Sequence, residues 1–385
     1  MPERTAEPAR PAGPAGEPEL KHLQSAVDDF VGPEQAESWD LAGEIPQELL
    51  RDFGARGLLC AQLPSAHGGL GLGSLDSGRL TAHVGSRCSS LRSVMTSQGM
   101  AAWTIQRLGD PAQTAELLPQ LAGGRLAAVG FSETEAGSDL SSMATRIERA
   151  GDTVVLDGHK VWVTGAHYAD LLVVFGTCEG GAAAVVVPAS APGVHVERVA
   201  DPLGCRAAGH ANVRFDSVRL PASSVLGSPG APLALLVTTA LAYGRISVAW
   251  GCVGILRACR NAAARHADSR TQSGKPLAEH QLVARHLAEL LVAEQVAERA
   301  CEHASECWSA GSPELVVATV LAKHVAAGNA ARGASSAVQV LASAGSRDGH
   351  VVARAYRDAK LMEIIEGSNE ICQLILAQHA VATAE

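Results

Sequence analysis

Apolar residues change their spacing twice along this chain. Over residues 19–128 they recur every three or four positions, as in amphipathic helices, and over residues 229–385 the same spacing returns. Between them, residues 129–228 carry short continuous or alternating apolar runs typical of strands. Residues 1–18 are rich in Pro, Ala and Glu and lack apolar periodicity, so we expect a disordered tail. The pattern predicts an α+β protein with an N-terminal helical domain, a middle β domain and a C-terminal helical bundle.

Two local signals predict where elements turn or begin. Asp157 and Gly158 lie between two strand-like runs, residues 153–156 and 161–164, which indicates a β-hairpin that turns at Asp157–Gly158. Ser312 and Pro313 suit the N-cap and the first position of a helix, so a helix is expected to begin there.

Composition and charge exclude several classes of function. The 385 residues are 47% hydrophobic and 18% charged, with a net charge of −9 and no basic tract, which argues against a nucleic-acid-binding surface. The nine cysteines form an odd set without a C-x-x-C pair, so reduced thiols are expected rather than a disulfide framework or a metal site. No uncharged apolar run approaches the roughly 18 residues of a membrane span, and the N-terminus lacks the apolar core of a signal peptide. We therefore expect a cytoplasmic protein without a membrane segment.

Four segments carry chemistry-bearing residues in a fixed order. Residues 131–139 read F-S-E-T-E-A-G-S-D, residues 160–164 read K-V-W-V-T, and residues 270–276 read R-T-Q-S-G-K-P. Residues 355–371 read A-Y-R-D-A-K-L-M-E-I-I-E-G-S-N-E-I. Together they resemble the T-E-P-x-A-G-S-D, K-x-W-I-T, R-x-Q-F-G-K-P and Y-R-D-A-K…Y-E-G-T-N-E-I motifs of acyl-CoA dehydrogenases. The resemblance implies the fold of that family, with a barrel-like middle β domain and a C-terminal four-helix bundle.

The resemblance implies that Glu366 is the catalytic base of an FAD-dependent dehydrogenase. A thioester α-proton is only weakly acidic, so its removal needs a carboxylate whose pKa is raised by desolvation. In the family the backbone N–H of the base also helps to bind the thioester oxygen, where charge develops. Glu363, one turn earlier, is the internal rival for this role, and the family pattern selects Glu366. Taken alone, Glu366 would read as a solvated helix carboxylate.

Further positions match family residues that contact the flavin or the substrate. Flavin contacts are implied at Phe131, Ser132, Gly137, Ser138, Trp162, Thr164, Ser368 and Glu370. Contacts to the FAD of a neighbouring subunit are implied at Arg270, Gln339 and Ser343, which requires at least a dimer. Substrate contacts are implied at Ser138, Arg245 and Gly367. A small hydroxylated acyl group would need a short pocket with polar ends, for which Thr96, Ser97 and Tyr243 are candidates; the alternative for each is helix capping or packing. The alternative for Trp162 and Thr164 is ordinary strand packing, and for Arg245 a structural ion pair. The chain departs from the family pattern at Ser273, at Ile365 and at residues 342–343, where Ala and Ser replace the usual Gly pair.

A closer resemblance connects the chain with dehydrogenases that act on acyl carrier proteins. Residues 89–99, 242–254 and 360–367 resemble the enzymes that make hydroxymalonyl or methoxymalonyl extender units for polyketide antibiotics in actinomycetes. This implies a glyceryl-type thioester on an acyl carrier protein (ACP), oxidised toward hydroxymalonyl-ACP. Either the alcohol is oxidised through an enol that becomes an aldehyde, or an aldehyde hydrate is oxidised to the carboxylate. The implied partners are the ACP, an electron-transfer flavoprotein or oxygen as electron acceptor, and further copies of the chain in a dimer or tetramer. Because carrier proteins are acidic, a local Arg/Lys patch is expected at the entrance.

Three other functions fit parts of the sequence. The first is a short-chain acyl-CoA dehydrogenase of catabolism, and the second keeps the fold but acts as a flavin monooxygenase or nitroalkane-type oxidase. The third is a flavin-free relative that only binds a carrier protein, against which the retained Glu366 speaks.

Overall fold

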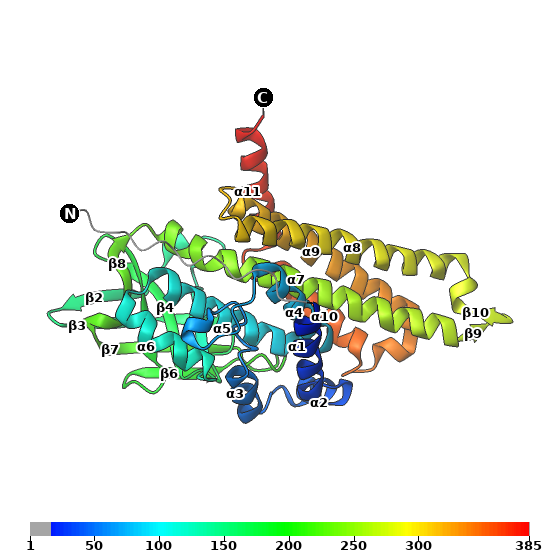
Figure 1. The fold of residues 1–385 in the computed structure, drawn as a ribbon, viewed down its shortest axis with the longest axis horizontal. Coiled ribbons are helices and arrows are strands. Elements are labelled where there is room, and N and C mark those ends of the chain that lie inside the picture. Colours follow the sequence, from blue (N-terminus) through cyan, green and yellow to red (C-terminus); the bar gives the residue numbers. More distant parts are fainter. Residues whose placement is uncertain (1–16, 385) are drawn as a thin grey trace.

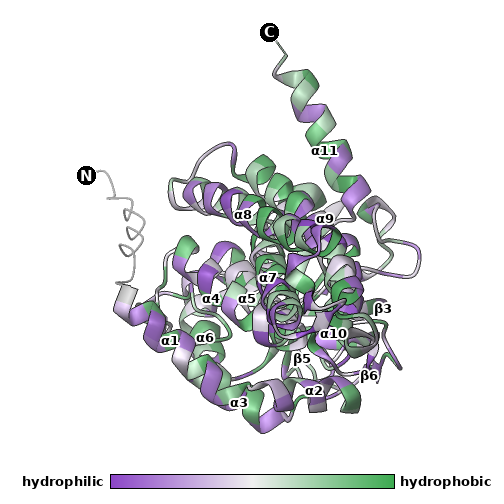
Figure 2. Ribbon diagram, turned by 90° about the vertical axis from the view of Figure 1, so that its right-hand side faces the viewer, coloured by the Kyte–Doolittle hydropathy of each residue, from purple (hydrophilic) through white to green (hydrophobic). Residues whose placement is uncertain are grey.

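The computed structural model describes residues 17–384, with a sheet at one end and a helical bundle at the other (Figure 1). The predicted tail lies outside the described residues, except that Glu17 and Pro18 already belong to the first helix, α1 (Glu17–Phe30). Viewed along the bundle, α4, α5, α8, α9 and α10 surround α7 (Figure 2). This central helix therefore contacts both helical parts of the chain.

The N-terminal part is helical, as its apolar spacing predicts. Its further helices are α2 (Pro33–Ala42), α3 (Gln47–Ala55), α4 (Ser74–Arg87), α5 (Ser89–Leu108) and α6 (Pro111–Ala122). The Gly-rich stretch after α3 forms a short 3₁₀ turn, Ser65–His67, and a loop. Helix α5 is buried over most of its length although many of its side chains are polar, so it places several polar groups inside the protein.

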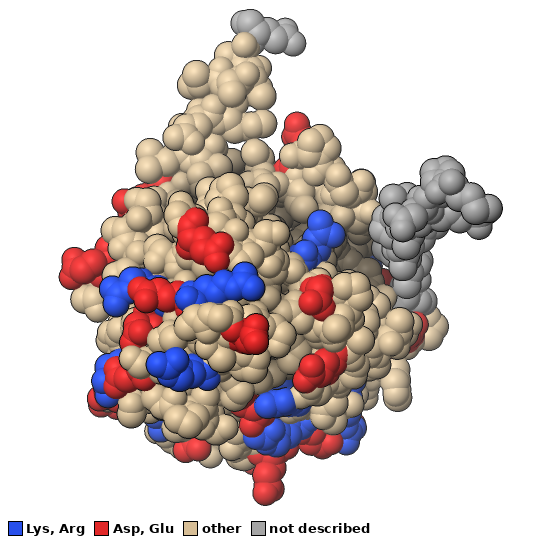
Figure 3. Space-filling view, turned by 90° about the vertical axis from the view of Figure 1, so that its left-hand side faces the viewer, with Lys and Arg blue, Asp and Glu red and all other residues tan. Residues whose placement is uncertain are grey.

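The middle part forms one eight-stranded sheet. Its strands are β1 (Ala127–Gly130), β2 (Arg146–Ala150), β3 (Thr153–Val163), β4 (Leu171–Cys178), β5 (Gly181–Pro188), β6 (Val194–Arg198), β7 (Ala211–Pro221) and β8 (Val225–Ala231). The order is β6-β7-β3-β2-β4-β5-β8, with β1 parallel to β4. On the face at the sheet end of the molecule, basic and acidic side chains are intermixed (Figure 3).

The hairpin predicted at Asp157–Gly158 is wrong. Strand β3 runs through these residues, and the turn comes earlier, where Ala150 pairs with Thr153 across Gly151. At Asp157 the pairing of β3 with β7 shifts register, and the carboxylate accepts a hydrogen bond from the Ser217 N–H at 2.7 Å. The extra residue lies on β7, where Asp216 and Ser217 together stand opposite Asp157, so the Asp-Gly pair faces a β-bulge and β3 continues without reversing.

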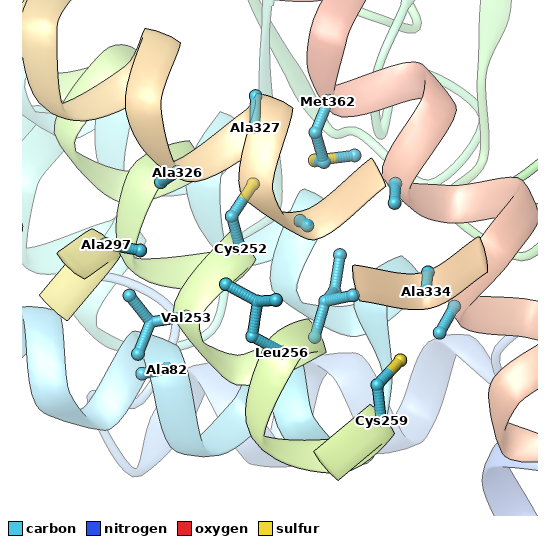
Figure 4. Close-up of a cluster of buried hydrophobic side chains, with 14 of the residues drawn as sticks. Ala82, Cys252, Val253, Leu256, Cys259, Ala297, Ala326, Ala327, Ala334 and Met362 are labelled. Carbon is cyan, nitrogen blue, oxygen red and sulfur yellow. The ribbon is translucent and has the colours of Figure 1, made fainter. Parts of the chain in front are cut away.

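The C-terminal part is a bundle of long helices with small side chains between them. These are α7 (Leu233–Ser269), α8 (Gln281–Ser309), α9 (Leu315–Leu341), α10 (Val351–Ile364) and α11 (Asn369–Ala382). A short hairpin, β9 (Thr271–Gln272) with β10 (Lys275–Pro276), joins α7 to α8. Cys252 and Leu256 of α7 belong to one buried cluster with Ala326 of α9 and Ala297 of α8 (Figure 4). Alanines at these contacts let the helix axes lie close together.

Helix α7 is long and apolar enough to cross a membrane by length and composition alone, but 67% of its apolar window is buried inside the protein. Its composition is therefore accounted for by its central place in the bundle.

Helix α9 begins later than the sequence predicts, and helix α11 stands apart from the other helices of the bundle. Helix α9 begins at Leu315 rather than at Pro313, because Leu315 N–H first closes a tight turn onto the Ser312 carbonyl at 3.1 Å. Helix α11 projects away from the bundle (Figure 1) and leaves Leu374 and Val381 exposed.

Candidate active site

Glu366 lies in the loop that joins α10 to α11. Helix α10 ends at Ile364, and the Ser368 hydroxyl caps α11 by accepting a hydrogen bond from the Ile371 N–H at 3.4 Å. Between them Glu366 has φ 56° and Gly367 has φ 87°, so two successive residues are left-handed. A non-glycine residue in this region carries backbone strain of order 1 kcal/mol, which persists only where the surroundings enforce it.

The Glu366 carboxylate points at α7, where Gly244 leaves room for it. A Cβ atom added at Gly244 would lie 2.6 Å from Glu366 Cδ and 3.0 Å from Met100 Cε. Both distances are shorter than an ordinary contact between carbon atoms. Glycine at position 244 therefore permits the approach of the carboxylate to the helix.

Two buried cations hold this loop through its carbonyl oxygens. Arg245 Nε donates to the Glu366 carbonyl at 3.1 Å. Lys323 Nζ donates to the carbonyls of Gly367 at 2.6 Å and Glu363 at 3.3 Å, and to Asn369 Oδ1 at 3.4 Å. Arg245 thus supports the loop rather than forming the ion pair considered from the sequence. Neither cation pairs with a carboxylate of residues 17–384, and the charges of both lower the pKa of the Glu366 side chain.

The carboxyl group of Glu366 is poised to exchange a proton near neutral pH. Its Oε2 atom is buried without a hydrogen-bond partner. Burial raises the pKa of Glu366 to about 7, although the charges of Arg245, Lys323 and Arg92 oppose that shift. A carboxylate with such a pKa suits a general base at neutral pH.

Glu363, the rival carboxylate, lies in a different setting. Its Oε2 pairs with Lys360 Nζ at 3.0 Å, and its Oε1 accepts a hydrogen bond from Asn369 Nδ2 at 3.3 Å. Both oxygens of Glu363 are therefore already bonded, whereas Glu366 Oε2 is free to receive a proton.

A buried ion pair shapes the loop after β1, which carries Phe131, Ser132, Gly137 and Ser138. Lys160 Nζ donates to Glu133 Oε1 at 2.7 Å and to the Phe131 carbonyl at 3.0 Å. Glu133 in turn accepts the backbone N–H groups of residues 144 and 145, which closes the loop. Gly137 and Ser138 lie on the exposed rim of this loop. A Cβ added at Gly137 would meet no atom of the described residues beyond its chain neighbours within 4 Å, so the space beside it is open.

A bulge at the end of β3 exposes the Trp162 indole. Trp162 has φ 55°, is 52% exposed, and donates its backbone N–H to Asn212 Oδ1 at 3.1 Å. The His210 ring lies 5.7 Å from the indole, and its Nδ1 lies 3.2 Å from Thr164 Oγ1. Burial lowers the pKa of His210 to about 4, so this ring is neutral at neutral pH. An exposed indole beside bonded polar groups forms a flat face on which an aromatic ring could stack.

Helix α5 connects the two parts of this region. Ser97 Oγ donates to the Thr164 carbonyl at 2.8 Å, which fixes α5 to the end of β3. Thr96 Oγ1 lies 2.7 Å from Ser247 Oγ on α7. Tyr243 is buried beside Gly99 and edge-on to Trp308, so it belongs to the core next to the site.

The residues expected to reach a neighbouring subunit lie at the opposite end of the bundle. Arg270 follows Arg245 by 25 positions of α7, which corresponds to about 38 Å along a helix axis. Gln339 and Ser343 are exposed at the end of α9 and in the turn after it. Within one chain, these three residues do not join Glu366 and Trp162. Glu370 is exposed in the first turn of α11.

Sequence reasoning missed several residues of this region. Lys323 and Arg92 are charged residues on predicted apolar or helical segments, and each is buried in the structure. A lone charge inside a long helix core is a signal for such positions, because lysine and arginine are almost never fully buried without a partner. Ser247 and His210 carry no comparable signal in the sequence.

Comparison with known proteins gives consistent matches over most of the described chain. Family models for the N-terminal, middle and C-terminal domains of acyl-CoA dehydrogenases match residues 17–125, 128–218 and 234–381. The glutaryl-CoA dehydrogenase of Desulfococcus multivorans is 30% identical over 373 residues, which cover 93% of this chain and 95% of that protein.

Two solved structures illustrate the range of similar folds. FkbI, described as serving biosynthesis of the methoxymalonyl extender unit of the Fk520 polyketide, is 62% identical with a TM-score of 0.90, covering 94% of this chain and 100% of that one. Butyryl-CoA dehydrogenase from Megasphaera elsdenii is 26% identical with a TM-score of 0.90, covering 94% of this chain and 98% of that one.

Proposed function

This chain belongs to the acyl-CoA dehydrogenase family, and from that premise we propose that Glu366 removes the α-proton of a short acyl thioester carried by an ACP. As a member, the protein is a flavoprotein oxidoreductase that acts on CH–CH bonds and uses FAD. The observation that carries the proposal is the Glu366 carboxyl group, which is buried over Gly244 with a pKa of about 7.

The residues near β3 fit an FAD molecule. The exposed face of Trp162, the hydroxyl of Thr164 and the open rim at Gly137 offer a stacking surface, polar contacts and space for phosphates. His210 Nε2 is buried without a partner beside them and could bond a polar edge of the cofactor or substrate. When bound, FAD would accept the hydride from the β-carbon of the thioester.

The other steps belong to this chain's own residues. Glu366 in its ionised form takes the α-proton, and its desolvated setting makes it basic enough for this transfer. Arg245 and Lys323 hold the Glu366 loop in its strained conformation, so the carboxylate keeps its position while the proton moves. The backbone N–H of Glu366 would donate to the thioester oxygen as charge develops there.

The proposed substrate is a glyceryl-type acyl-ACP, oxidised toward hydroxymalonyl-ACP in polyketide extender-unit biosynthesis. The similarity to FkbI supports this choice. The proposed partners are the ACP, an electron-transfer flavoprotein or oxygen, and further copies of the chain. The position of Arg270 and Gln339 far from Glu366, together with the exposed apolar side chains of α11, supports an oligomer. The cytoplasmic location and the basic patch for ACP docking stay predictions.

The test is anaerobic mixing of the purified holoenzyme with glyceryl-ACP or with butyryl-CoA while flavin absorbance is followed. We expect rapid bleaching with glyceryl-ACP, and we expect Glu366→Gln to retain FAD but lose bleaching. Bleaching by butyryl-CoA alone would overturn the substrate, and full reduction in Glu366→Gln would overturn the base.

A further inference from the structure

The His210 ring is buried just before β7, where the main chain is held on both sides of it. The His210 carbonyl accepts a hydrogen bond from the Val199 N–H at 2.9 Å, and the Gly209 carbonyl accepts one from the His167 N–H at 3.1 Å. Gly209 has φ 64°, and a Cβ added there would lie 2.4 Å from Tyr168 Cε2. Because the backbone is fixed in this way and His210 is only 7% exposed, the ring has a defined position.

The two nitrogens of the His210 ring have different surroundings. Nδ1 lies 3.2 Å from Thr164 Oγ1, whereas Nε2 is buried without a hydrogen-bond partner among the described residues. Burial, and to a smaller extent the charge of Arg92, lowers the pKa of His210 to about 4. The ring is therefore neutral at neutral pH, with one nitrogen protonated and the other a bare acceptor.

The unpartnered Nε2 atom indicates which nitrogen of His210 carries the proton. A proton on Nε2 would leave a buried N–H without an acceptor, whereas a proton on Nδ1 leaves only a buried lone pair. On protein backbones, buried N–H groups without a partner are rarer than acceptors without one. The geometry therefore favours the proton on Nδ1, from where it is donated to Thr164 Oγ1.

The position of this proton decides what the Thr164 hydroxyl can do. Thr164 is half-buried, its carbonyl accepts a hydrogen bond from Ser97 Oγ at 2.8 Å, and the exposed Trp162 indole precedes it by two residues. A hydroxyl group has one proton to donate. When the His210 ring donates to Oγ1, the hydroxyl proton is free for a ligand that lies on the Trp162 face. When the ring accepts, that proton is bound inside the protein.

We propose that His210 is a positioning residue, whose Nδ1–H donates to Thr164 Oγ1 and so holds the Thr164 hydroxyl as a hydrogen-bond donor toward the FAD ring system. This deepens the proposed function, on which it rests for the cofactor. A hydroxyl held in this way meets an acceptor atom of the ring with its proton. With the proton of His210 on the other nitrogen, the hydroxyl would present a lone pair to the same acceptor, and the contact would be lost.

The first experiment locates the proton on the ring. The FAD-loaded protein is labelled with histidine that carries nitrogen-15 only at Nδ1, and protons bonded directly to that nitrogen are detected by NMR at neutral pH. We expect a ring N–H signal that disappears in His210→Asn, which assigns it to His210. The complementary sample is labelled only at Nε2. A signal in that sample that disappears in His210→Asn would overturn the proposal.

The second experiment asks whether His210 acts through Thr164. FAD affinity is measured from flavin fluorescence as the holoenzyme is diluted. His210→Phe removes the donor and keeps an aromatic ring, and Thr164→Val removes the hydroxyl and keeps the branched shape. Each should weaken FAD binding about two- to tenfold, the range of one hydrogen bond. The double variant should bind FAD as weakly as Thr164→Val alone, and losses that multiply would overturn the proposal.

Two further variants separate positioning from packing. His210→Asn should keep most of the FAD affinity, because the amide nitrogen of asparagine stands as far from the backbone as Nδ1 does. It also decides the question where His210→Phe does not fold, since an affinity as low as that of Thr164→Val would then refute the role. His167→Phe, which changes a ring 5.3 Å from that of Tyr168, should leave FAD affinity unchanged. Neither experiment uses a substrate, so failure of glyceryl-ACP to bleach the flavin would overturn the proposed substrate alone.

Discussion

The close approach of Glu366 to Gly244 makes Gly244→Ala the sharpest test of the site. The added methyl group would lie 2.6 Å from Glu366 Cδ, whereas carbon atoms in contact lie about 3.5 Å apart or more. The carboxyl group must therefore move by about 1 Å, since it is the movable end of a side chain and Gly244 is fixed in α7. A displacement of this size at a reacting group costs on the order of a hundredfold in rate, or about 2.7 kcal/mol of transition-state stabilisation.

The assay is the rate of flavin reduction by substrate in anaerobic stopped flow, with FAD content and melting temperature measured on the same preparation. We expect Gly244→Ala to bind FAD normally and to melt near the wild type, because a helical alanine gains about 1 kcal/mol over glycine while the crowding costs about 1–3 kcal/mol.

Gly328→Ala is the matched control. It lies in α9, and the nearest atom to its added Cβ is Arg332 Nη1 at 3.4 Å, the end of a flexible side chain. That variant should reduce its flavin at the wild-type rate. Wild-type reduction in Gly244→Ala, or the same loss in Gly328→Ala, would refute the placement of the carboxylate.

Three further predictions follow from buried charges. The pKa of Glu366 is about 7 in the folded chain and 4.5 ordinarily. Because the base must be ionised, kcat/KM should fall about tenfold per pH unit below 7. Because the unfolded chain releases this proton more easily, the free energy of unfolding should fall as pH rises from about 4.5 through 7. Glu366→Gln should therefore be more stable than the wild type by about 3 kcal/mol at pH 8 and no more stable at pH 4. Urea titrations check this, and an equal difference in unfolding free energy between the two proteins at both pH values would contradict it. Lys323→Met should lose about 2 kcal/mol of unfolding free energy, because it leaves the loop carbonyls without their hydrogen-bond donor. It should also move the pKa seen in the pH profile of kcat/KM above 7, because it removes a charge that lowers the pKa of Glu366. An unchanged pH profile would contradict this prediction. Lys160→Met should lose about 3–5 kcal/mol of unfolding free energy in urea and much of its bound FAD, because it leaves Glu133 buried without its partner. The double variant Lys160→Met with Glu133→Gln should lose less unfolding free energy. Strictly additive losses would exclude a coupled pair.

The sequence alone predicts the helical or strand character of the three parts of the chain, and its motifs single out the residue on which the proposed site is centred. Helical and strand periods separate the three parts of the chain because burial of one face leaves a clear repeat. The Asp157–Gly158 hairpin was wrong because the same dipeptide can also lie inside a strand opposite a bulge of its neighbour, and only the pairing with β7 decides between them. The start of α9 was misplaced by two residues because a tight turn precedes its first helical bond.

The surroundings of Glu366 could not be predicted in the same way. Arg92 and Met362 are 270 positions apart, yet their side chains meet beside the site. The hydrogen bonds from Lys323 to the loop carbonyls have no periodic signal in the sequence, and neither has the contact between the Thr96 and Ser247 hydroxyls. Both depend on how the helices pack and on which side-chain rotamers fit. The motif predicts Glu366 as the base, and the three-dimensional packing shows which charged groups surround its side chain.

The left-handed backbone at Glu366 has a consequence for protein engineering. Glycine would adopt φ 56° without strain and would remove a desolvated carboxyl group, so Glu366→Gly should fold more favourably than the natural chain above neutral pH. Under the proposed function the same variant has no base. A thermostability screen that ranks clones by melting temperature would thus enrich inactive enzymes at this position, and selection for heat resistance here must be coupled to turnover.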